Sequence, residues 1–508
     1  MNTTSELLPF LARGALVAGH RPWSRFRLNR MQWGEFVTAL GQHDDWALLG
    51  LWAEPHEVHA AIYEDSTKTV AVASLECVGE SFPTLSRVRP SAIRLERTIQ
   101  DLTGLQAEGL EDTRPWFDHG QFPLVHPLAN MPLPPQPRPA SAYPTLRAEG
   151  HGIHQIPVGP VHAGIIEPGH FRFSANGEAV VRLEARLGYV HKGVEKQMQG
   201  LESADAAKIA ARISGDSTVA HSLAFARAVE AALDVKVPGR AQWLRGIMAE
   251  LERVANHLGD VGAICNDAAF SFMLGQCGIL REKVLAAAAT CFGHRLMMDR
   301  VVPGGVAVDL NVTGVEFLHR LTKELRDQFA PLMTIYEDKS SLLDRTMTTG
   351  IVSAALVHRF AAGGFVGRAS ARGFDARRAL PYAPYAGLDF EVPVLSRGDV
   401  HARLMIRSQE IFISLDLIDQ MLRHLPAGEL MIPLPTAAGE GMALVEAFRG
   451  DILTWVRLDA GGRIARCHPR DASWFQWPLL EVCVEGNIVA DFPLCNKSFN
   501  CSYSGHDL

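Results

Sequence analysis

The chain has 508 residues, a formal net charge of −7, and 47% hydrophobic against 21% charged residues. This length exceeds what one hydrophobic core usually supports, so we expect two domains. The composition is that of an ordinary globular protein, and the acidic balance argues against nucleic acid as a partner.

No run of about 18 uncharged apolar residues predicts a membrane span, and the first ten residues lack the basic and apolar regions of a signal peptide. A cytoplasmic location follows as the expectation. The eight cysteines include no pair with CxxC spacing. We therefore expect reduced, mostly buried thiols and no iron–sulfur cluster held by this chain.

The first 125 residues predict a small α+β domain. A helical pattern over residues 31–40 precedes two segments of alternating apolar residues, 58–63 and 69–74, which are typical of strands. Residues 96–105 read ERTIQDLTGL. This segment is either an amphipathic helix that ends at a glycine cap or a family signature.

A proline-rich segment follows, with seven prolines between residues 126 and 144. Such a segment favours an extended conformation and excludes a helix or a central strand. We therefore predict a linker over residues 126–150, which divides the chain into domains at 1–125 and 151–508.

The second domain predicts mixed structure. A hairpin over residues 171–183 turns at Asn176-Gly177, which tolerate positive φ. Apolar residues at helical spacing predict a buried helical bundle from residues 203–213, 219–233, 242–261 and 275–300. Strands are predicted near the end, at 444–449, 452–458 and 464–468. The fold class is thus α+β, with a small N-terminal α+β domain and a large domain of central helices and peripheral strands.

The segment Arg212-Ile-Ser-Gly-Asp-Ser-Thr-Val-Ala-His221 carries the most specific spacing. It resembles the RxCGxCxxxH motif of NiFe hydrogenase large subunits, with Ser214 and Ser217 in place of both cysteines. A thiol with a pKa near ~8.5 can supply the soft thiolate ligand that a nickel–iron centre needs, whereas a serine hydroxyl is a hard donor that deprotonates far less readily. The resemblance implies a hydrogenase scaffold without a nickel–iron centre.

Further short sequences resemble, in the same order, the large-subunit family shared by complex I and the energy-converting hydrogenases. They are GPVH at 159–162, EPGH at 167–170, GYVHKGVEK at 188–196, ELERVANHL at 250–258, PGGV at 303–306, LDFEVP at 388–393, GD at 398–399, GE at 439–440 and VEAFRG at 445–450. Residues 96–105 resemble the ERxxxDLxGI signature of the complex I 30 kDa subunit. The chain therefore resembles a fusion of the 30 kDa and 49 kDa subunits and is most similar to formate-hydrogenlyase-type large subunits.

The second half of a hydrogenase metal site would read DPCxxC. We place it at Asp491, with Cys495 and Cys501 at the wrong offsets. This predicts no metal in the chain. One alternative is that Cys495 and Cys501 bind some other metal; the other, which we favour, is free cysteines in a packed tail.

The resemblance implies a redox or quinone-like cavity lined by His162, His170, Arg212, Ser214, Ser217, His221, Asp267 and Asp491. In complex I a histidine and a tyrosine bind the quinone headgroup. Here the tyrosine position falls near Gly215, the histidine falls on Ile166 or on a neighbouring hairpin histidine, and Asp267 matches the aspartate that steadies the histidine. The quinone pair is therefore incomplete.

Simpler structural roles compete with these assignments. His221 is expected to be structural, and Ser214 and Ser217 could cap the helix that follows them. Glu250, Arg253 and His257 share one helix face, which predicts a buried ion pair beside a histidine or, as an alternative, a proton relay.

The resemblance implies an oxidoreductase subunit of a membrane-associated, complex I-like and ion-translocating complex on the inner face of the cell membrane. Its expected partners are a small iron–sulfur subunit, a membrane arm with antiporter-like subunits and other electron-transfer subunits. The chain itself would bind no cofactor, with quinone as the candidate acceptor; NAD binding is not predicted because no GxGxxG motif or P-loop is found. The alternatives are a quinone reductase with substituted residues, a non-catalytic scaffold and, against the missing ligands, an active hydrogenase.

Overall fold

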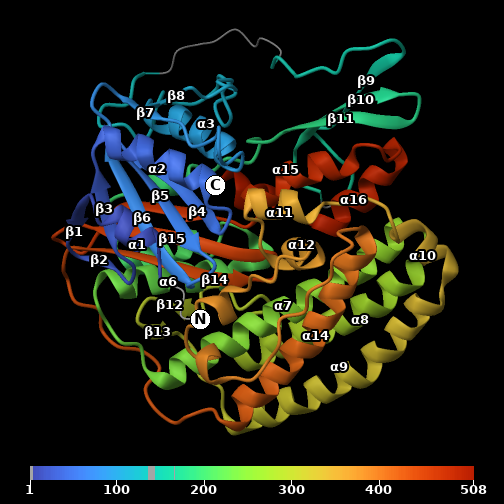
Figure 1. Ribbon diagram of the computed structural model, residues 1–508. Helices are drawn as coiled ribbons and strands as arrows, with labels where there is room; N and C mark the ends of the chain where they lie inside the picture. The colour runs from blue at the N-terminus through green and yellow to red at the C-terminus, as the bar shows by residue number, and fades with distance from the viewer. Residues whose placement is uncertain (1–3, 135–142, 165) are drawn as a thin grey trace.

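The computed structural model describes residues 4–134, 143–164 and 166–508 and confirms the α+β class. In Figure 1 the N-terminal strands lie at the left, the long helices at the lower right, and a separate three-stranded sheet at the upper right. Among the described residues, no helix is both long enough and apolar enough to cross a membrane.

The N-terminal part is built on a five-stranded sheet in the order β1–β3–β6–β5–β4. Its strands are β1 (Ala15–Val17), β3 (Arg25–Leu28), β4 (Trp46–Glu54), β5 (Glu57–Glu64) and β6 (Thr69–Glu76). Helices α1 (Leu7–Leu11), α2 (Arg30–Gln42) and α3 (Ala92–Thr103) pack on it. Helix α2 begins where Asn29 and Gln32 form a capping box, and α3 ends at Gly104 with φ 85°.

A second sheet, in the order β16–β15–β14–β2, packs against the first. Its strands are β2 (His20–Arg21), β14 (Gly439–Ala447), β15 (Gly450–Leu458) and β16 (Ile464–Arg470). The rings of Trp52 and Trp455 meet in the core between the two sheets, with centroids 5.5 Å apart. Because the N-terminal sheet is covered on both faces, almost every residue of β5 and β6 is buried, including the polar members of the predicted alternation.

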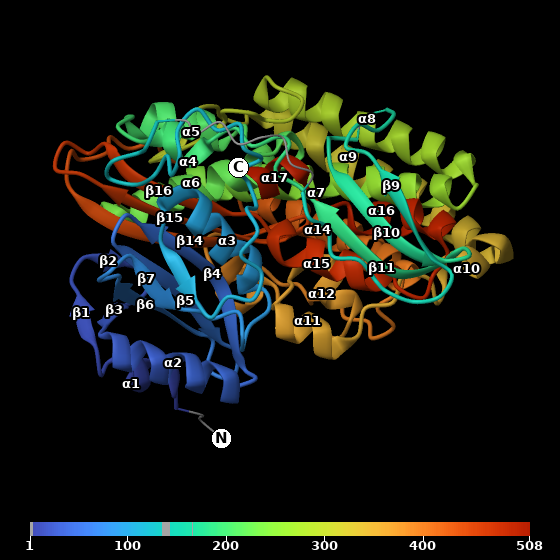
Figure 2. The ribbon, with the colours of Figure 1, turned by 90° about the horizontal axis from the view of Figure 1, so that it is seen from above.

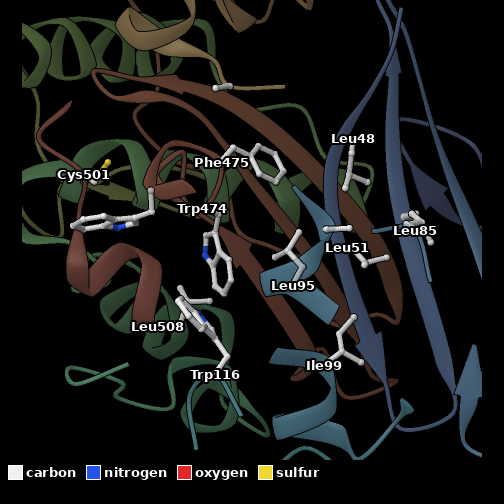
Figure 3. Close-up of a cluster of buried hydrophobic side chains, with 14 of the residues drawn as sticks. Leu48, Leu51, Leu85, Leu95, Ile99, Trp116, Trp474, Phe475, Cys501 and Leu508 are labelled. Carbon is white, nitrogen blue, oxygen red and sulfur yellow. The ribbon is translucent and has the colours of Figure 1, made fainter. Parts of the chain in front are cut away.

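The two parts of the chain are joined by strand pairing as well as by side-chain packing. Strand β2 pairs in parallel with β14, with His20 opposite Glu440, so a segment from the first 125 residues is an edge strand of the second sheet. Figure 3 shows the core beneath α3, where side chains such as Trp116 meet Trp474 and Leu508 from the other end of the sequence. The domain boundaries stay predictions, and residues 135–142 of the proposed linker lie outside the described part.

Four long helices form a bundle; the predicted segments 242–261 and 275–300 supply two of them, whereas 203–213 and 219–233 form two shorter helices and the other two long helices were not predicted. The four are α7 (Gly239–Asp267), α8 (Ser271–Phe292), α9 (Val312–Asp338) and α14 (Val400–Arg423), and they pack on one another (Figure 1). Helix α8 ends earlier than its apolar pattern predicted, because Gly293 takes a left-handed φ of 74° as its cap.

The predicted hairpin is the centre of the third sheet, β9 (Ile153–Val158), β10 (His170–Asn176) and β11 (Ala179–Arg186). Figure 2 places this sheet alongside α16 and α15. The other helices are α4 (Val194–Met198), α5 (Ser203–Ala210), α6 (Thr218–Ala232), α10 (Ser340–Thr346), α11 (Ala354–Phe360), α12 (Gly364–Ala369), α13 (Ala376–Ala379), α15 (Ser473–Val484), α16 (Phe492–Phe499) and α17 (Tyr503–Asp507). Two short pairs complete the strands: β7 (Ser81–Pro83) with β8 (Gln106–Glu108), and β12 (Val301–Val302) with β13 (Gly305–Val306).

Candidate functional site

The segment with the two serines connects α5 to α6. Ser214 is extended, with φ −143° and ψ 119°, and residues Gly215–Ser217 form a single 3-10 turn before α6 begins. The Lys192 ammonium donates to the Ile213 carbonyl at 2.9 Å, which fixes the chain just before the serine.

The serine side chains do not cap α6. The Glu252 carboxylate accepts from the backbone N–H groups of Val219 and Ala220, at 2.7 and 3.1 Å, and so satisfies the start of that helix. Both serine hydroxyls instead donate to Oδ1 of Asp216, at 2.8 and 3.2 Å. The predicted capping role is therefore wrong, and the hydroxyls are gathered on one carboxylate.

The C-terminal tail reaches this segment through Ser502. The hydroxyl oxygens of Ser214 and Ser502 lie 2.9 Å apart, and both side chains are buried. Ser502 and Gly505 have the i, i+3 spacing of a CxxC pair. This corrects the sequence alignment: the tail meets the serine segment at Ser502, and Asp491 instead accepts a hydrogen bond from Arg345 at 3.1 Å.

The space beside Gly505 is filled by a carboxylate. A Cβ atom on Gly505 would lie 2.9 Å from Cγ of Asp471 and 2.9 Å from the Ser502 hydroxyl. Asp471 is held there by His221, whose Nε2 lies 3.0 Å from the carboxylate Oδ2. The opposing effect of burial is outweighed by His221, so the pKa of Asp471 is lowered. His221 thus pairs with a buried carboxylate of the site.

Arg449 closes the site from the turn between β14 and β15. Its guanidinium donates to the Asp216 carboxylate, at 2.8 Å for Oδ1, and to the Ser217 hydroxyl at 3.0 Å. Burial opposes ionisation of both partners, but the ion pair outweighs it, so the pKa of Asp216 is lowered and that of Arg449 is raised. We call Ser214, Asp216, Ser217, Arg449 and Ser502 the serine cluster.

These residues do not fit a nickel–iron centre. The positions with the spacing of the four thiolates are Ser214, Ser217, Ser502 and Gly505, which offer three hard hydroxyls and no side chain. The guanidinium of Arg449 donates to the Ser217 hydroxyl, so a positive charge lies beside one of these four positions.

Among the described residues, one group of three has donors close enough to hold another ion: Glu54, Glu57 and His59. Arg457 pairs with the first carboxylate, and Arg25 and Arg27 pair with the second. The group is therefore a charge-balanced contact at the junction of the two sheets and contains none of the tail cysteines, which are buried.

The two predicted histidines near the hairpin contact backbone carbonyl groups that flank β10 and β9. Nε2 of His162 lies 2.7 Å from the Gly169 carbonyl, and Nδ1 of His170 lies 3.2 Å from the Gly159 carbonyl. Burial lowers the pKa of His170, so its ring is neutral at physiological pH.

Two further predicted residues also have other partners. Arg212 forms a bidentate pair with Asp299, at 2.7 and 2.8 Å, in an exposed position. Asp267 ends α7 beside Lys497, and burial raises its pKa. Of the eight predicted site residues, Ser214 and Ser217 share the serine cluster.

Sequence reasoning missed Asp216, Arg449, Ser502 and Gly505 as site residues. Two signals could have found them. Arg449 belongs to the family-like VEAFRG sequence at 445–450, and Ser502 and Gly505 repeat the spacing of Ser214 and Ser217.

Comparison with known proteins identifies the family. A family model described as "Respiratory-chain NADH dehydrogenase, 49 Kd subunit" matches residues 267–438, and one described as "Nickel-dependent hydrogenase" matches residues 192–259. The chain is 31% identical to hydrogenase-4 component G of Escherichia coli over 92% of its length and 84% of the relative's. It is 30% identical to formate hydrogenlyase subunit 5 of the same organism, over 88% and 82% of the two chains.

Two further likenesses each cover about two thirds of this chain. The carbon monoxide-induced hydrogenase of Rhodospirillum rubrum is 33% identical over 68% of this chain and 97% of that protein. A chain of the membrane-bound sulfane sulfur reductase, an archaeal respiratory membrane complex, superposes with a TM-score of 0.67 at 25% identity, over 70% of this chain and 99% of its own length. This chain belongs to the family of NiFe hydrogenase large subunits and complex I 49 kDa subunits, in the branch of the formate-hydrogenlyase-type proteins.

Proposed function

We propose that this chain is the large subunit of a membrane-associated redox complex, in which electrons from an iron–sulfur cluster of a partner subunit arrive at the serine cluster. The relatives support a complex of this kind, because their names include a membrane-bound hydrogenase and NADH-quinone oxidoreductases. Ion translocation through a membrane arm and a place on the inner face of the cell membrane belong to the same proposal.

The observation that carries the proposal is the pairing of Arg449 with Asp216 between the serine hydroxyls. An acceptor that gains an electron develops negative charge on its oxygen atoms. Fixed hydroxyl and guanidinium donors stabilise such charge when they are arranged before the reaction. The Asp216 side chain is 36% exposed, whereas the other four members of the serine cluster are buried, so a partner or acceptor would approach from the side of Asp216.

The hydrogen-bond donors of the serine cluster favour a quinone, and not protons, as the electron acceptor. The quinone's carbonyl oxygens would accept hydrogen bonds from Arg449 and Ser214 in place of the Asp216 carboxylate, which accepts from both in this structure, whereas proton reduction to hydrogen needs the metal that the site does not fit. The reductase would then use the serine cluster in place of the histidine and tyrosine of complex I.

The test uses the intact complex purified from its source. Reduced methyl viologen supplies electrons to the iron–sulfur partner, and decylubiquinone or menadione serves as the acceptor. We expect acceptor reduction, no hydrogen production from viologen, and no stoichiometric nickel. Stoichiometric nickel with hydrogen production would overturn the proposal.

Variants separate catalysis from a scaffold role. The double variant S214A/S502A should lower acceptor reduction at least tenfold, about 1.4 kcal/mol in the barrier, while the complex still assembles. Ser370→Ala is the matched control, because that hydroxyl is also fully buried but has no hydrogen-bond partner. Unchanged reduction in the double variant would show that the chain is a scaffold. If H170Q or D267N lost acceptor reduction while the double variant kept it, the quinone would instead bind near His170 and Asp267.

A further inference from the structure

Six buried side chains beneath the serine cluster form a closed ring of alternating charge. In order they are Arg368, Glu410, Arg253, Glu250, Arg377 and Asp375. Neighbouring nitrogen and oxygen atoms are 2.6 to 3.8 Å apart around the ring. Every member is at most 1% exposed. Three guanidinium groups and three carboxylates make the ring neutral.

Two more titratable groups are attached to this ring. Oε1 of Glu446 lies 2.8 Å from Nη1 of Arg368, and Nε2 of His257 lies 2.8 Å from Oε2 of Glu410. The exposed fractions of Glu446 and His257 are 1% and 0%. With Glu446 ionised and His257 neutral, the group holds four negative charges against three positive ones. An uncompensated buried charge is costly, and one bound proton removes it.

Among the described residues, no charged side chain other than Arg368 forms an ion pair with Glu446, and none other than Glu410 pairs with His257. The other charged groups that face Glu446 and His257 are two closed ion pairs and one arginine: Asp260 with Arg407, Asp451 with Arg470, and Arg372. Arg372 donates to a backbone carbonyl and lies over the ring of Phe374. The uncharged neighbours of Glu446 are Tyr382 and the Ala376 amide.

The pKa directions agree with a proton at this place. Burial, reinforced by Asp375, raises the pKa of Glu446 to about 7 against the opposing Arg368. Burial lowers the pKa of His257, although Glu410 opposes it. Near neutral pH, therefore, the Glu446 carboxyl carries the proton in preference to the His257 imidazole.

A short turn connects this group to the serine cluster. The Arg253 guanidinium donates to the carbonyl oxygens of Glu446 and Ala447, at 2.8 and 2.9 Å. The next residue, Phe448, packs edge-on against the His257 ring, and the Arg449 guanidinium lies 4.5 Å from the Phe448 ring centre. Glu446 and Arg449 thus stand at the two ends of one rigid turn.

We propose that Glu446 and His257 share one exchangeable proton and that this proton compensates negative charge at the serine cluster. The proton-binding site follows from the ring alone; its role in turnover rests on the proposed function. One electron from the reduced iron–sulfur cluster of a partner adds one negative charge to the acceptor. Because the pKa of Glu446 is about 7, part of the population holds the carboxylate near neutral pH; one proton from solvent then converts that carboxylate to the carboxylic acid, and no other bond changes.

Infrared spectroscopy of the purified full-length chain tests the proton directly, because a protonated carboxyl has its own carbonyl band. Burial also raises the pKa of Glu96 to about 7 and of Glu252 to about 8. The variant E96Q/E252Q should therefore keep a carboxylic acid that titrates near neutral pH, and adding E446Q should remove the part of the band that belongs to Glu446. If E446Q does not fold, the test rests on E96Q/E252Q alone. The proposal is overturned if this variant shows no carboxylic acid that titrates near neutral pH.

The variant D216N tests the link to the serine cluster without any electron donor. Removing the Asp216 charge leaves Arg449 uncompensated, which favours the ionised form of Glu446. The midpoint of the Glu446 band should fall by about one pH unit, a tenfold loss of proton affinity. Glu324→Gln, on the exposed face of α9, is the charge-matched control and should not move it. An unchanged midpoint in D216N overturns the proposal. Because neither readout uses an acceptor, failure of the proposed function would leave both intact.

Discussion

The hydroxyl oxygens of Ser214 and Ser502 are 2.9 Å apart although 288 residues separate them in the sequence. The position of Ser502 is set by its own backbone: its N–H donates to Ser473 at 2.9 Å, and its carbonyl accepts from the Trp477 indole at 3.1 Å. The serine cluster is therefore created by the packing of α15 and the tail on α6, and it depends on the fold as a whole.

The close contact of Gly505 with Asp471 predicts intolerance to any side chain there. Gly505→Ala should lower the free energy of unfolding by about 1–3 kcal/mol, since the new methyl group overlaps the carboxylate. Gly215→Ala is the matched control, because no atom lies within 4 Å of its Cβ position; its effect should stay within about 0.5 kcal/mol. Urea unfolding of both variants makes the comparison, and equal stabilities would contradict it.

Restoring thiols should not restore a metal site. In S214C/S217C/S502C the fourth thiolate is still missing and Arg449 still supplies a positive charge beside residue 217. We expect no stoichiometric nickel by elemental analysis after expression with a hydrogenase maturation system. Adding G505C should reduce the soluble yield instead of improving metal content. Recovery of nickel in the quadruple variant would show that Asp471 moves aside.

Arg449 should not be replaceable by lysine. Lysine keeps the charge, but it lacks the planar fork that binds the Asp216 carboxylate and the Ser217 hydroxyl together. R449K should fold, because the buried carboxylate keeps a cation, yet reduce acceptors at least tenfold more slowly. Steady-state rates with decylubiquinone measure this. Arg240→Lys, which pairs with Asp309 at the far end of α7, serves as the control.

Glu252 predicts a pH dependence of stability. Burial raises its folded pKa to about 8, well above that of a free glutamate at about 4.3. Between these values the unfolded chain releases this proton and the folded chain keeps it, so the free energy of unfolding falls as the pH rises. In E252Q the free energy of unfolding should fall less steeply between about pH 4.3 and about pH 8, the unfolded and folded pKa values of Glu252. Urea titrations at several pH values reveal the slope, and an identical slope in wild type and variant would sink the prediction.

The junction of the two sheets should be a major source of stability. Trp455 is fully buried between them, and Trp455→Ala should cost about 3–5 kcal/mol. The exposed Leu16 provides the control, since Leu16→Ala removes little buried area. Fluorescence and circular dichroism should report one shared unfolding transition. A variant in which the N-terminal sheet unfolds separately would contradict the packing described above.

The sequence predicted the helices and the turn whose apolar spacing or turn residues are local signals. The patterns at 219–233 and 242–261 lie within α6 and α7 to within a few residues, and Asn176-Gly177 marks the hairpin turn. It was insufficient where tertiary contacts decide. Residues 444–449 were predicted as a strand, but β14 ends at Ala447, because Gly364 packs against the backbone of Arg449 and Gly450 in the turn.

The site was predicted in part for the same reason. Ser214 and Ser217 could be identified because their spacing is local. Ser502 and Gly505 repeat this spacing in the tail, but spacing alone does not show which part of the tail meets the serine segment; the contact between Ser214 and Ser502 does. Nor does sequence spacing show that Arg449 would point at Asp216, since the orientation of a turn depends on the strands that hold it.

The parallel pairing of β2 with β14 has a consequence for how the protein is made. Residues 20 and 21 are synthesised early, yet their strand partner follows more than four hundred residues later. Until then the edge remains unpaired, and formation of so distant a contact is slow. In a single polypeptide the tether keeps the two strands at a high effective concentration, so this step needs no encounter between separate molecules. Cutting the chain between the two parts would make the same pairing depend on protein concentration.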